Sequence, residues 1–226
     1  DFSGYSEMAI GLGMMFGFTL PANFHAPYRA TSLRDFWRRW HITLGSWVRD
    51  YLYFPLGGSR AGRWRTAVNL ILVMVLVGLW HGAAWQFLIW GGLHGLLLAA
   101  ERLARPLGLG RHLPTVLRAA LTFLVVTLTW VVFRADSPVE AWHYYAALVG
   151  GLDPGGPAWW TRQLVMNWES FALLLLAALV TWGGHSPTRF VTGASRGKWV
   201  LLTILLWICL VAMGAQSGNP FLYYFF

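Results

Sequence analysis

The longest stretch without a charged side chain sets the first limit on how this chain can fold. Residues 67–100 form a run of 34 residues that contains no Asp, Glu, Lys or Arg. As one helix this run would be about 51 Å long, whereas a bilayer's hydrocarbon core is about 30 Å thick. The run must therefore break, and Gly78, Gly82 and the pair Gly91-Gly92 are its weak points. We predict two shorter helices that meet near Trp80-His81-Gly82.

Basic residues flank the run on both sides. Arg63 and Arg65 precede it, and Arg102 and Arg105 follow it. If both pairs stay on one side of the membrane, the chain returns to the side it entered from and carries His81 toward the membrane interior. A spanning helix followed by an interfacial helix would also fit the pattern.

The composition supports lipid as the solvent. The chain is 57% hydrophobic and only 12% charged, whereas soluble domains carry about 25% charged residues. A formal net charge of +8 in a soluble protein would suggest nucleic acid. Here the basic residues lie between apolar runs, so we expect anionic lipid headgroups and no nucleic acid as neighbours. The predicted fold class is all-α: a polytopic membrane bundle with interfacial or re-entrant helices.

Further membrane segments follow from apolar runs. The run at residues 8–20 is too short to span alone and looks like the tail of a helix. The chain also opens at Asp1 without a Met, so we expect a fragment that lacks N-terminal helices, folded as one membrane domain over 1–226. Three more spans are predicted near residues 116–133, 164–182 and 199–215.

The segments between the spans have distinct compositions. Two prolines mark residues 21–29 as a loop. Residues 31–65 interleave arginines with aromatic residues, which suits helices at the headgroup level. Residues 142–160 are aromatic and rich in turn residues, and we predict a loop with interfacial or re-entrant pieces.

Two histidines lie within the uncharged run. His81 and His94 are 13 residues apart, and an ionisable residue inside a bilayer is a candidate for function. An imidazole there can accept or donate a proton near neutral pH. The alternative is that each packs between helices with its hydrogen bond satisfied. No metal site is expected, because the spacing is not i, i+4 and no Cys or carboxylate lies near either histidine in sequence.

His41 lies close to three arginines, Arg34, Arg38 and Arg39. Such a cluster can bind the phosphate groups of an acyl donor, or the headgroups of lipids. Both interpretations stay open at this point.

Several short motifs resemble those of the membrane-bound O-acyltransferase family, in its alginate O-acetyltransferase branch. The motifs cover nearly the whole chain in the expected order: DFSGYSEMAIG (1–11), FWRRWHI (36–42), RDYLY (49–53), PLGG (55–58), GLWHG (78–82) with Trp85, FRA (133–135) and NPFLYYFF (219–226). Full members of the family are about twice as long as this chain.

The resemblance implies transfer of an acyl group from a thioester to a hydroxyl, within the membrane. It places the family's embedded histidine at His81 and its second histidine at His41, both as catalytic residues. An imidazole in a water-poor pocket can remove the hydroxyl proton as the oxygen attacks the thioester. Further candidates for shaping the pocket, binding the donor or holding His41 are Asp35, Arg38, Arg39, Asp50, Trp80 and Trp85.

By the same resemblance, we expect acetyl transfer during exopolysaccharide O-acetylation in a bacterial inner membrane. The donor would be a substrate, acetyl-CoA or an acyl carrier, with no bound cofactor. A periplasmic acetyltransferase partner and polysaccharide machinery are implied. The alternatives are D-alanyl transfer to teichoic acids, and a non-enzymatic transporter or structural subunit of a polysaccharide-export complex.

Overall fold

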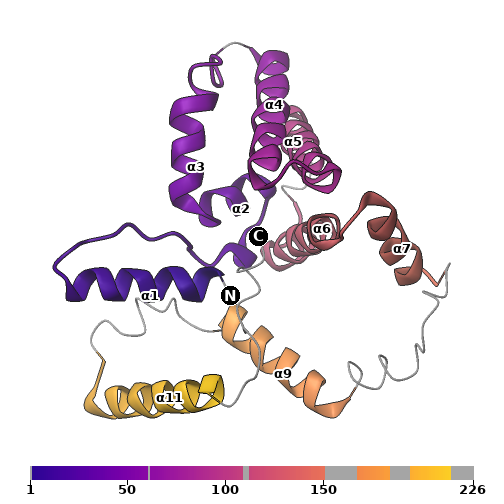
Figure 1. The fold of residues 1–226 in the computed structure, drawn as a ribbon. Helices are drawn as coiled ribbons and strands as arrows, with labels where there is room; N and C mark the ends of the chain where they lie inside the picture. The colour runs from indigo at the N-terminus through magenta and orange to yellow at the C-terminus, as the bar shows by residue number, and fades with distance from the viewer. Residues whose placement is uncertain (1, 61, 109–111, 151–166, 184–193, 215–226) are drawn as a thin grey trace.

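The computed structural model describes residues 2–60, 62–108, 112–150, 167–183 and 194–214. All regular secondary structure in these residues is helical (Figure 1). Four of the helices are long and apolar enough to cross a membrane: Arg63–His81, Trp85–Leu107, Thr115–Arg134 and Arg196–Gly214. The predicted all-α membrane fold is confirmed.

The uncharged run folds into a helical hairpin, as predicted. Helix α4 spans Arg63–His81 and α5 spans Trp85–Ala104, so the break falls directly after His81. The two helices lie side by side in Figure 1. This arrangement brings Arg63 and Arg102 to one end of the hairpin, here called the basic end, and His81 to the other.

Glycines let α4 and α5 touch through their backbones. A Cβ on Gly91 would overlap the carbonyl oxygen of Met74, and one on Gly78 would overlap that of Phe87. A Cβ on Gly95 would lie 2.6 Å from the Cα of Ile71. Gly78 and Gly91 are therefore packing positions, and neither breaks its helix.

Two of the three remaining predicted spans agree with the structure, whereas the third contains an apolar helix, Trp168–Gly183, that is shorter than the four candidate spans over the described residues. Helix α6 (Thr115–Arg134) matches the span at 116–133, and α11 (Arg196–Gly214) matches the one at 199–215. The run at 164–182 contains α9 (Trp168–Ala178), which continues as a π-helix over Leu179–Gly183. Residues 164–166 and 215 lie outside the described part.

The first helix differs from its prediction. Helix α1 covers Phe2–Met15 and ends five residues before the apolar run does. Gly17 takes a left-handed conformation (φ 82°) and donates to the Met14 carbonyl, while the Phe18 amide donates to the Gly13 carbonyl. This is a glycine-based helix stop, so residues 16–20 are not the tail of a helix.

Short helices form the polar stretch that precedes the hairpin. A 3-10 turn (Pro27–Arg29) leads to α2 (Leu33–Arg39), α3 (Ile42–Val48) and a π-helix (Arg49–Tyr53). The Ser32 side chain caps α2 by accepting from the Asp35 amide.

Residues 142–148 are helical, within the segment that was predicted as a loop with interfacial or re-entrant pieces. They belong to α7 (Pro138–Leu148), whose Ser137 side chain accepts from the Glu140 amide. The Glu140 carboxylate accepts in turn from the Asp136 amide, the residue before the N-cap, and Pro138 occupies the favourable first position of the helix. The eleven residues of α7 are too few to span a bilayer. The rest of the predicted segment, 151–160, lies outside the described residues.

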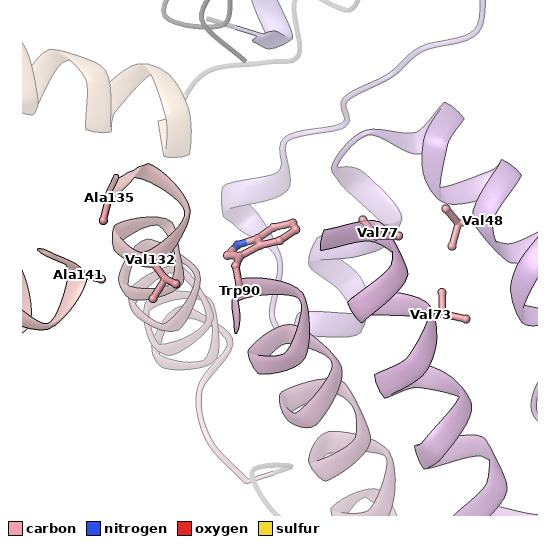
Figure 2. Close-up of a cluster of buried hydrophobic side chains, with 7 residues drawn as sticks. All are labelled: Val48, Val73, Val77, Trp90, Val132, Ala135 and Ala141. Carbon is pink, nitrogen blue, oxygen red and sulfur yellow. The ribbon is translucent and has the colours of Figure 1, made fainter. Parts of the chain in front are cut away.

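The core lies where α2, α4, α5 and α6 meet. One cluster contains Val73 and Val77 of α4, Trp90 of α5 and Val132 of α6 (Figure 2). A second cluster packs Phe36 of α2 against Val126 of α6. In Figure 1, α1, α9 and α11 lie outside this bundle.

His94 is a packed core residue. Its side chain is fully buried, Nδ1 accepts from the Trp37 indole (3.3 Å) and Nε2 contacts the Thr129 hydroxyl (2.9 Å). An indole nitrogen can only donate, so we infer that Nε2 carries the proton. Because the Thr129 hydroxyl donates to the Val126 carbonyl, every polar atom of this contact is satisfied.

Replacing Gly91 by Ala should destabilise the hairpin by about 1–3 kcal/mol, because the added methyl forces two backbones apart. Gly92→Ala is the matched control, since its Cβ would lie 4.0 Å from its nearest neighbour, Val75 Cγ2. That variant should be neutral or more stable by up to about 1 kcal/mol. Thermal unfolding of the detergent-purified protein measures both. Equal effects would contradict the backbone contact.

Candidate active site

Two histidines that are far apart in sequence share one small cavity. His41 and His81 both line a hollow of about 40 Å³. The rest of its wall is apolar or aromatic: Trp37, Trp40, Leu44, Trp90, Trp130 and Phe133. We call this the histidine cavity. Its volume is room for about three water-sized groups.

His81 is the last residue of α4, at the turn of the hairpin. Aromatic rings surround its imidazole: the ring centroids of Trp90 and Phe133 lie 5.4 Å and 5.1 Å away, both edge to face. The hairpin thus positions this histidine on a rigid helix end, and α5 and α6 supply the surrounding rings.

His41 occupies the junction between α2 and α3 with a left-handed backbone (φ 47°). This conformation is uncommon for a residue other than glycine. Asn23 holds it: the Ile42 amide donates to the Asn23 carbonyl, and the Asn23 Oδ1 atom lies 3.1 Å from His41 Nδ1.

The Asn23 contact also fixes the imidazole's proton. Asn23 Oδ1 accepts from the Thr43 amide and hydroxyl, so it is the amide oxygen and His41 Nδ1 must donate to it. We infer that Nε2 carries the free lone pair. Burial lowers the pKa of His41, which keeps the ring neutral, and able to accept a proton, at neutral pH.

A larger hollow of about 880 Å³ lies at the basic end of the bundle. We call it the arginine cleft, because six arginines from five elements and their connections line it: Arg34, Arg38, Arg49, Arg102, Arg105 and Arg118. Asp35 and Glu101 are its acidic residues. Burial, followed by the charges of Arg38, Arg105 and Arg102, lowers the pKa of Arg34. Cations gathered in this way favour an anionic ligand.

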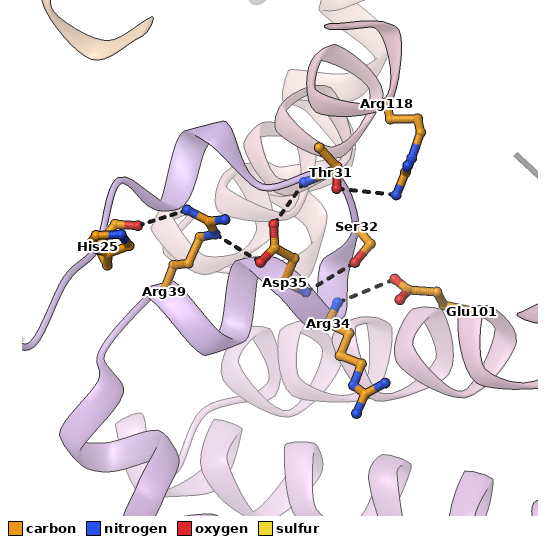
Figure 3. A network of polar contacts seen from close by, with 8 residues as sticks. All are labelled: His25, Thr31, Ser32, Arg34, Asp35, Arg39, Glu101 and Arg118. Atoms are coloured by element: carbon orange, nitrogen blue, oxygen red, sulfur yellow. Dashed lines mark hydrogen bonds and ion pairs between the residues drawn. The ribbon is translucent and has the colours of Figure 1, made fainter. Parts of the chain in front are cut away.

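Carboxylates hold α2 at the edge of this cleft (Figure 3). Glu101 Oε2 accepts from the Leu33 amide (2.8 Å) and the Arg34 amide (3.3 Å) at the start of α2. Asp35 accepts from Arg39 Nε (2.9 Å) and from the Thr31 amide. Arg39 also donates to the His25 carbonyl, so its role here is to brace the chain.

Helix α2 joins the two hollows. Its first residues lie at Glu101 near the basic end, its Trp37 contacts His94 halfway along α5, and His41 follows its last turn. One side of the helix carries Arg34 and Arg38 toward the cleft. Along α5, Arg102 and Trp90 are twelve residues apart, or about 18 Å.

The other predicted site residues lie away from the histidine cavity. Trp80 contacts the His81 ring at 4.9 Å but is 63% exposed, and Trp85 is 70% exposed. Asp50 pairs with the neighbouring Arg49 at the surface (2.8 Å). Asp35 and Arg38 line the arginine cleft, whereas Arg39 does not.

The sequence did not identify Asn23, Trp90 or three of the cleft's arginines as site residues. These arginines are Arg102, Arg105 and Arg118. Asn23 lies in a loop 18 residues before His41, and nothing in the local sequence reveals that contact. Trp90 precedes His94 by four residues, so both lie on one face of α5. That spacing could have indicated that Trp90 packs beside a buried histidine. Within the described residues no group of three or more His, Cys, Asp or Glu could hold a metal ion.

Comparison with known proteins places these residues in a family. The model of the membrane-bound O-acyltransferase family matches residues 1–133. A probable alginate O-acetylase AlgI of Azotobacter vinelandii is 53% identical over 206 residues, covering 88% of this chain and 40% of that protein. A peptidoglycan O-acetyltransferase of Helicobacter pylori is 46% identical over 152 residues, covering 66% of the chain and 29% of that protein.

Similarity to a neighbouring branch is lower. A teichoic acid D-alanyltransferase of Bacillus subtilis is 37% identical over 105 residues, covering 43% of the chain and 27% of that protein. The chain spans about half or less of the length of these curated relatives. The matched region holds both histidines and all the residues that line the arginine cleft. The chain belongs to the membrane-bound O-acyltransferase family.

Proposed function

We propose that the protein transfers an acetyl group from a thioester donor to a hydroxyl during O-acetylation of a cell-surface polysaccharide. One observation carries the proposal: His41 and His81, 40 residues apart, line the same aromatic-walled cavity in a bundle of membrane-spanning helices. The printed names of the AlgI and peptidoglycan O-acetyltransferase relatives support the acetyl group and the polysaccharide acceptor.

In the proposed reaction, an imidazole acts as general base. His81 accepts the proton of the incoming hydroxyl while the oxygen attacks the thioester carbonyl carbon. The carbonyl π electrons move to oxygen and form a tetrahedral oxyanion. When this collapses, the C–S bond breaks and the thiolate takes the proton from His81, leaving an ester and a thiol. His41, with its Nε2 lone pair free, is placed to contact the same reactants.

The arginine cleft suits the anionic end of the donor. Its guanidinium groups can pair with phosphates, and Arg102 lies about 18 Å along α5 from Trp90 of the histidine cavity. A donor that occupies both sites therefore needs a phosphate at one end, a thioester at the other and a slender arm between them. Acetyl-CoA and phosphopantetheine-bearing acyl carriers both meet this description.

The histidine cavity favours acetyl over other acyl groups. At about 40 Å³ it has room for the three heavy atoms of an acetyl group and little more. D-alanyl transfer is less well supported, because an alanyl ammonium group needs a carboxylate or other acceptor. None of the residues that line the cavity is Asp or Glu.

The proposal also implies a membrane location, a side of donor entry and an acceptor. A multi-pass protein of the bacterial inner membrane would receive its donor at the basic end, which the positive-inside rule assigns to the cytoplasm. The acceptor would be a polysaccharide, or a periplasmic acetyltransferase partner that passes the group on.

Replacing His81 by Ala in the full-length protein should lower acetyl transfer by about 10²–10⁴-fold, because the general base is lost. Membrane insertion should be normal. His112→Ala, at an exposed position outside the bundle, is the control and should acetylate normally. Mass spectrometry of surface glycans measures both. Wild-type acetylation in His81→Ala would remove the catalytic role and favour a transporter or structural subunit.

Replacing Arg34 and Arg38 together by Gln should raise the donor KM about tenfold or more, because two charge-assisted contacts to phosphate are lost. The rate at saturating donor should change little. Arg60→Gln with Arg65→Gln removes the same charge from exposed positions outside the cleft. Equal KM changes in the two double variants would point to general surface electrostatics and refute the cleft as donor site.

Replacing Leu44 by Ala should widen the histidine cavity and admit a propionyl donor, which the wild type should use at least about tenfold less well than acetyl. Leu52→Ala is the control, since Leu52 packs on the same core but does not line the cavity. The ratio of kcat/KM for the two donors measures the effect. A ratio that is unchanged in Leu44→Ala would mean that this cavity does not hold the acyl group.

A further inference from the structure

Two of the residues that line the histidine cavity, Trp90 and Trp130, have a buried indole nitrogen without a partner in the described part of the chain. The ring of Trp90 is the one that contacts the His81 imidazole. Trp90 is 99% buried, with 1% of its surface exposed, and its indole nitrogen makes no hydrogen bond there. A buried donor left unpaired costs free energy, and more so at membrane depth, where water does not compensate. Such a group calls for a reason to persist.

Other indoles of the same protein are paired. Trp37 donates to His94 Nδ1 (3.3 Å), and Trp182 donates to the Tyr28 carbonyl (3.1 Å). The packing therefore leaves the N–H of Trp90 open, as it also leaves that of the neighbouring Trp130, whereas the N–H of Trp37 is paired. Substituting a phenyl ring would avoid the cost, because the stacking on Trp130 (5.9 Å) needs only an aromatic face.

The Trp90 ring forms part of the wall of the histidine cavity. Figure 2 shows the nitrogen-bearing edge of the ring turned toward α6. Helix α6 contributes Trp130 and Phe133 to the cavity wall. The His81 imidazole stands edge to face with the Trp90 ring, at a centroid distance of 5.4 Å.

Acyl transfer needs two kinds of polar group beside the reacting carbonyl. A base must reach the attacking hydroxyl, and a hydrogen-bond donor must reach the carbonyl oxygen as negative charge develops on it. None of the residues that line the cavity is Arg or Lys. The Trp90 indole N–H is a buried donor held by packing, and its ring contacts the His81 imidazole. A donor fixed in advance costs no reorganisation during the reaction.

We propose that the Trp90 indole N–H donates a hydrogen bond to the thioester carbonyl oxygen and stabilises the oxyanion that forms when the hydroxyl attacks. This assignment rests on the proposed function. The atom balance is unchanged: the carbonyl π pair moves onto oxygen, the indole keeps its proton throughout, and the pair returns as the C–S bond breaks. Trp90 would be a catalytic residue beside His81, with a distinct role.

The test replaces Trp90 by Phe, and separately by 3-benzothienylalanine, in the full-length protein. The second residue keeps the bicyclic shape and substitutes sulfur for N–H, so it retains the packing. Each variant should lose about 10²–10³-fold in kcat for an acetyl thioester, as expected for one oxyanion donor. The donor KM and the pH at which the rate falls to half should stay at their wild-type values, because binding and the base are intact.

Trp182→Phe is the matched control, since it removes an indole N–H that is already paired outside the cavity. It should keep wild-type kcat. If Trp90→Phe does not fold, the benzothienyl variant decides. Wild-type kcat in the benzothienyl variant would overturn the proposal and leave a buried water as the partner of the N–H.

Different results would exclude the proposed function and the oxyanion role of Trp90. If the wild-type protein transfers no acyl group and His81→Ala changes nothing, the proposed function fails. If the wild type is active and His81→Ala is not, while the Trp90 variants keep their rate, only the oxyanion role fails. A further measurement uses the methyl-ketone analogue of an acetyl thioester: its carbonyl stretch should shift to lower frequency on binding to wild type and not on binding to the benzothienyl variant.

Discussion

The contact between the backbones of α4 and α5 is the constraint on which the rest of the structure depends. Gly78, Gly91 and Gly95 leave no room for a side chain between the two helices, so the hairpin closes tightly along its length. That closure brings His81 beside Trp90 at one end and the four flanking arginines of the uncharged run together at the other. In lipid, where apolar side chains gain little by meeting each other, such close packing is a principal source of helix association.

Helix α2 converts this hairpin into a site. It is only seven residues long, too short to be stable alone, and its conformation depends on side chains from other elements. Glu101 accepts from its first amides, His94 accepts from Trp37, and Asn23 fixes His41 just past its end. Helix α2 thus contributes Arg34 and Arg38 to the wall of the arginine cleft. It contributes Trp37 to the histidine cavity, and His41 follows just beyond its last turn.

The features that could be predicted from the sequence are those with a length scale or a short motif. The uncharged run, as a single helix, would be longer than a membrane is thick, and this predicted the hairpin and its break near His81. Hydropathy predicted the spans that α6 and α11 form. The end of α1 was missed because one glycine outweighed the hydropathy of residues 16–20. Helix α7 was predicted only as an interfacial or re-entrant piece of a loop, and its bounds follow from the capping contacts of Ser137 and Glu140. Tertiary packing, which no local pattern encodes, brings Trp90 to the histidine cavity, Arg118 to the arginine cleft and Asn23 to His41.

The satisfied contact among Trp37, His94 and Thr129 also bears on permeability. It lies between the histidine cavity and the arginine cleft, two distinct hollows near opposite ends of the hairpin. Both nitrogens of His94 are already bonded, and the aromatic rings of Trp37 and Trp90 pack against its imidazole. In an energised membrane, a continuous wet route between those hollows would carry protons down their gradient. The packed His94 contact keeps the histidine cavity and the arginine cleft as two separate hollows, so they do not join into one such route along the hairpin.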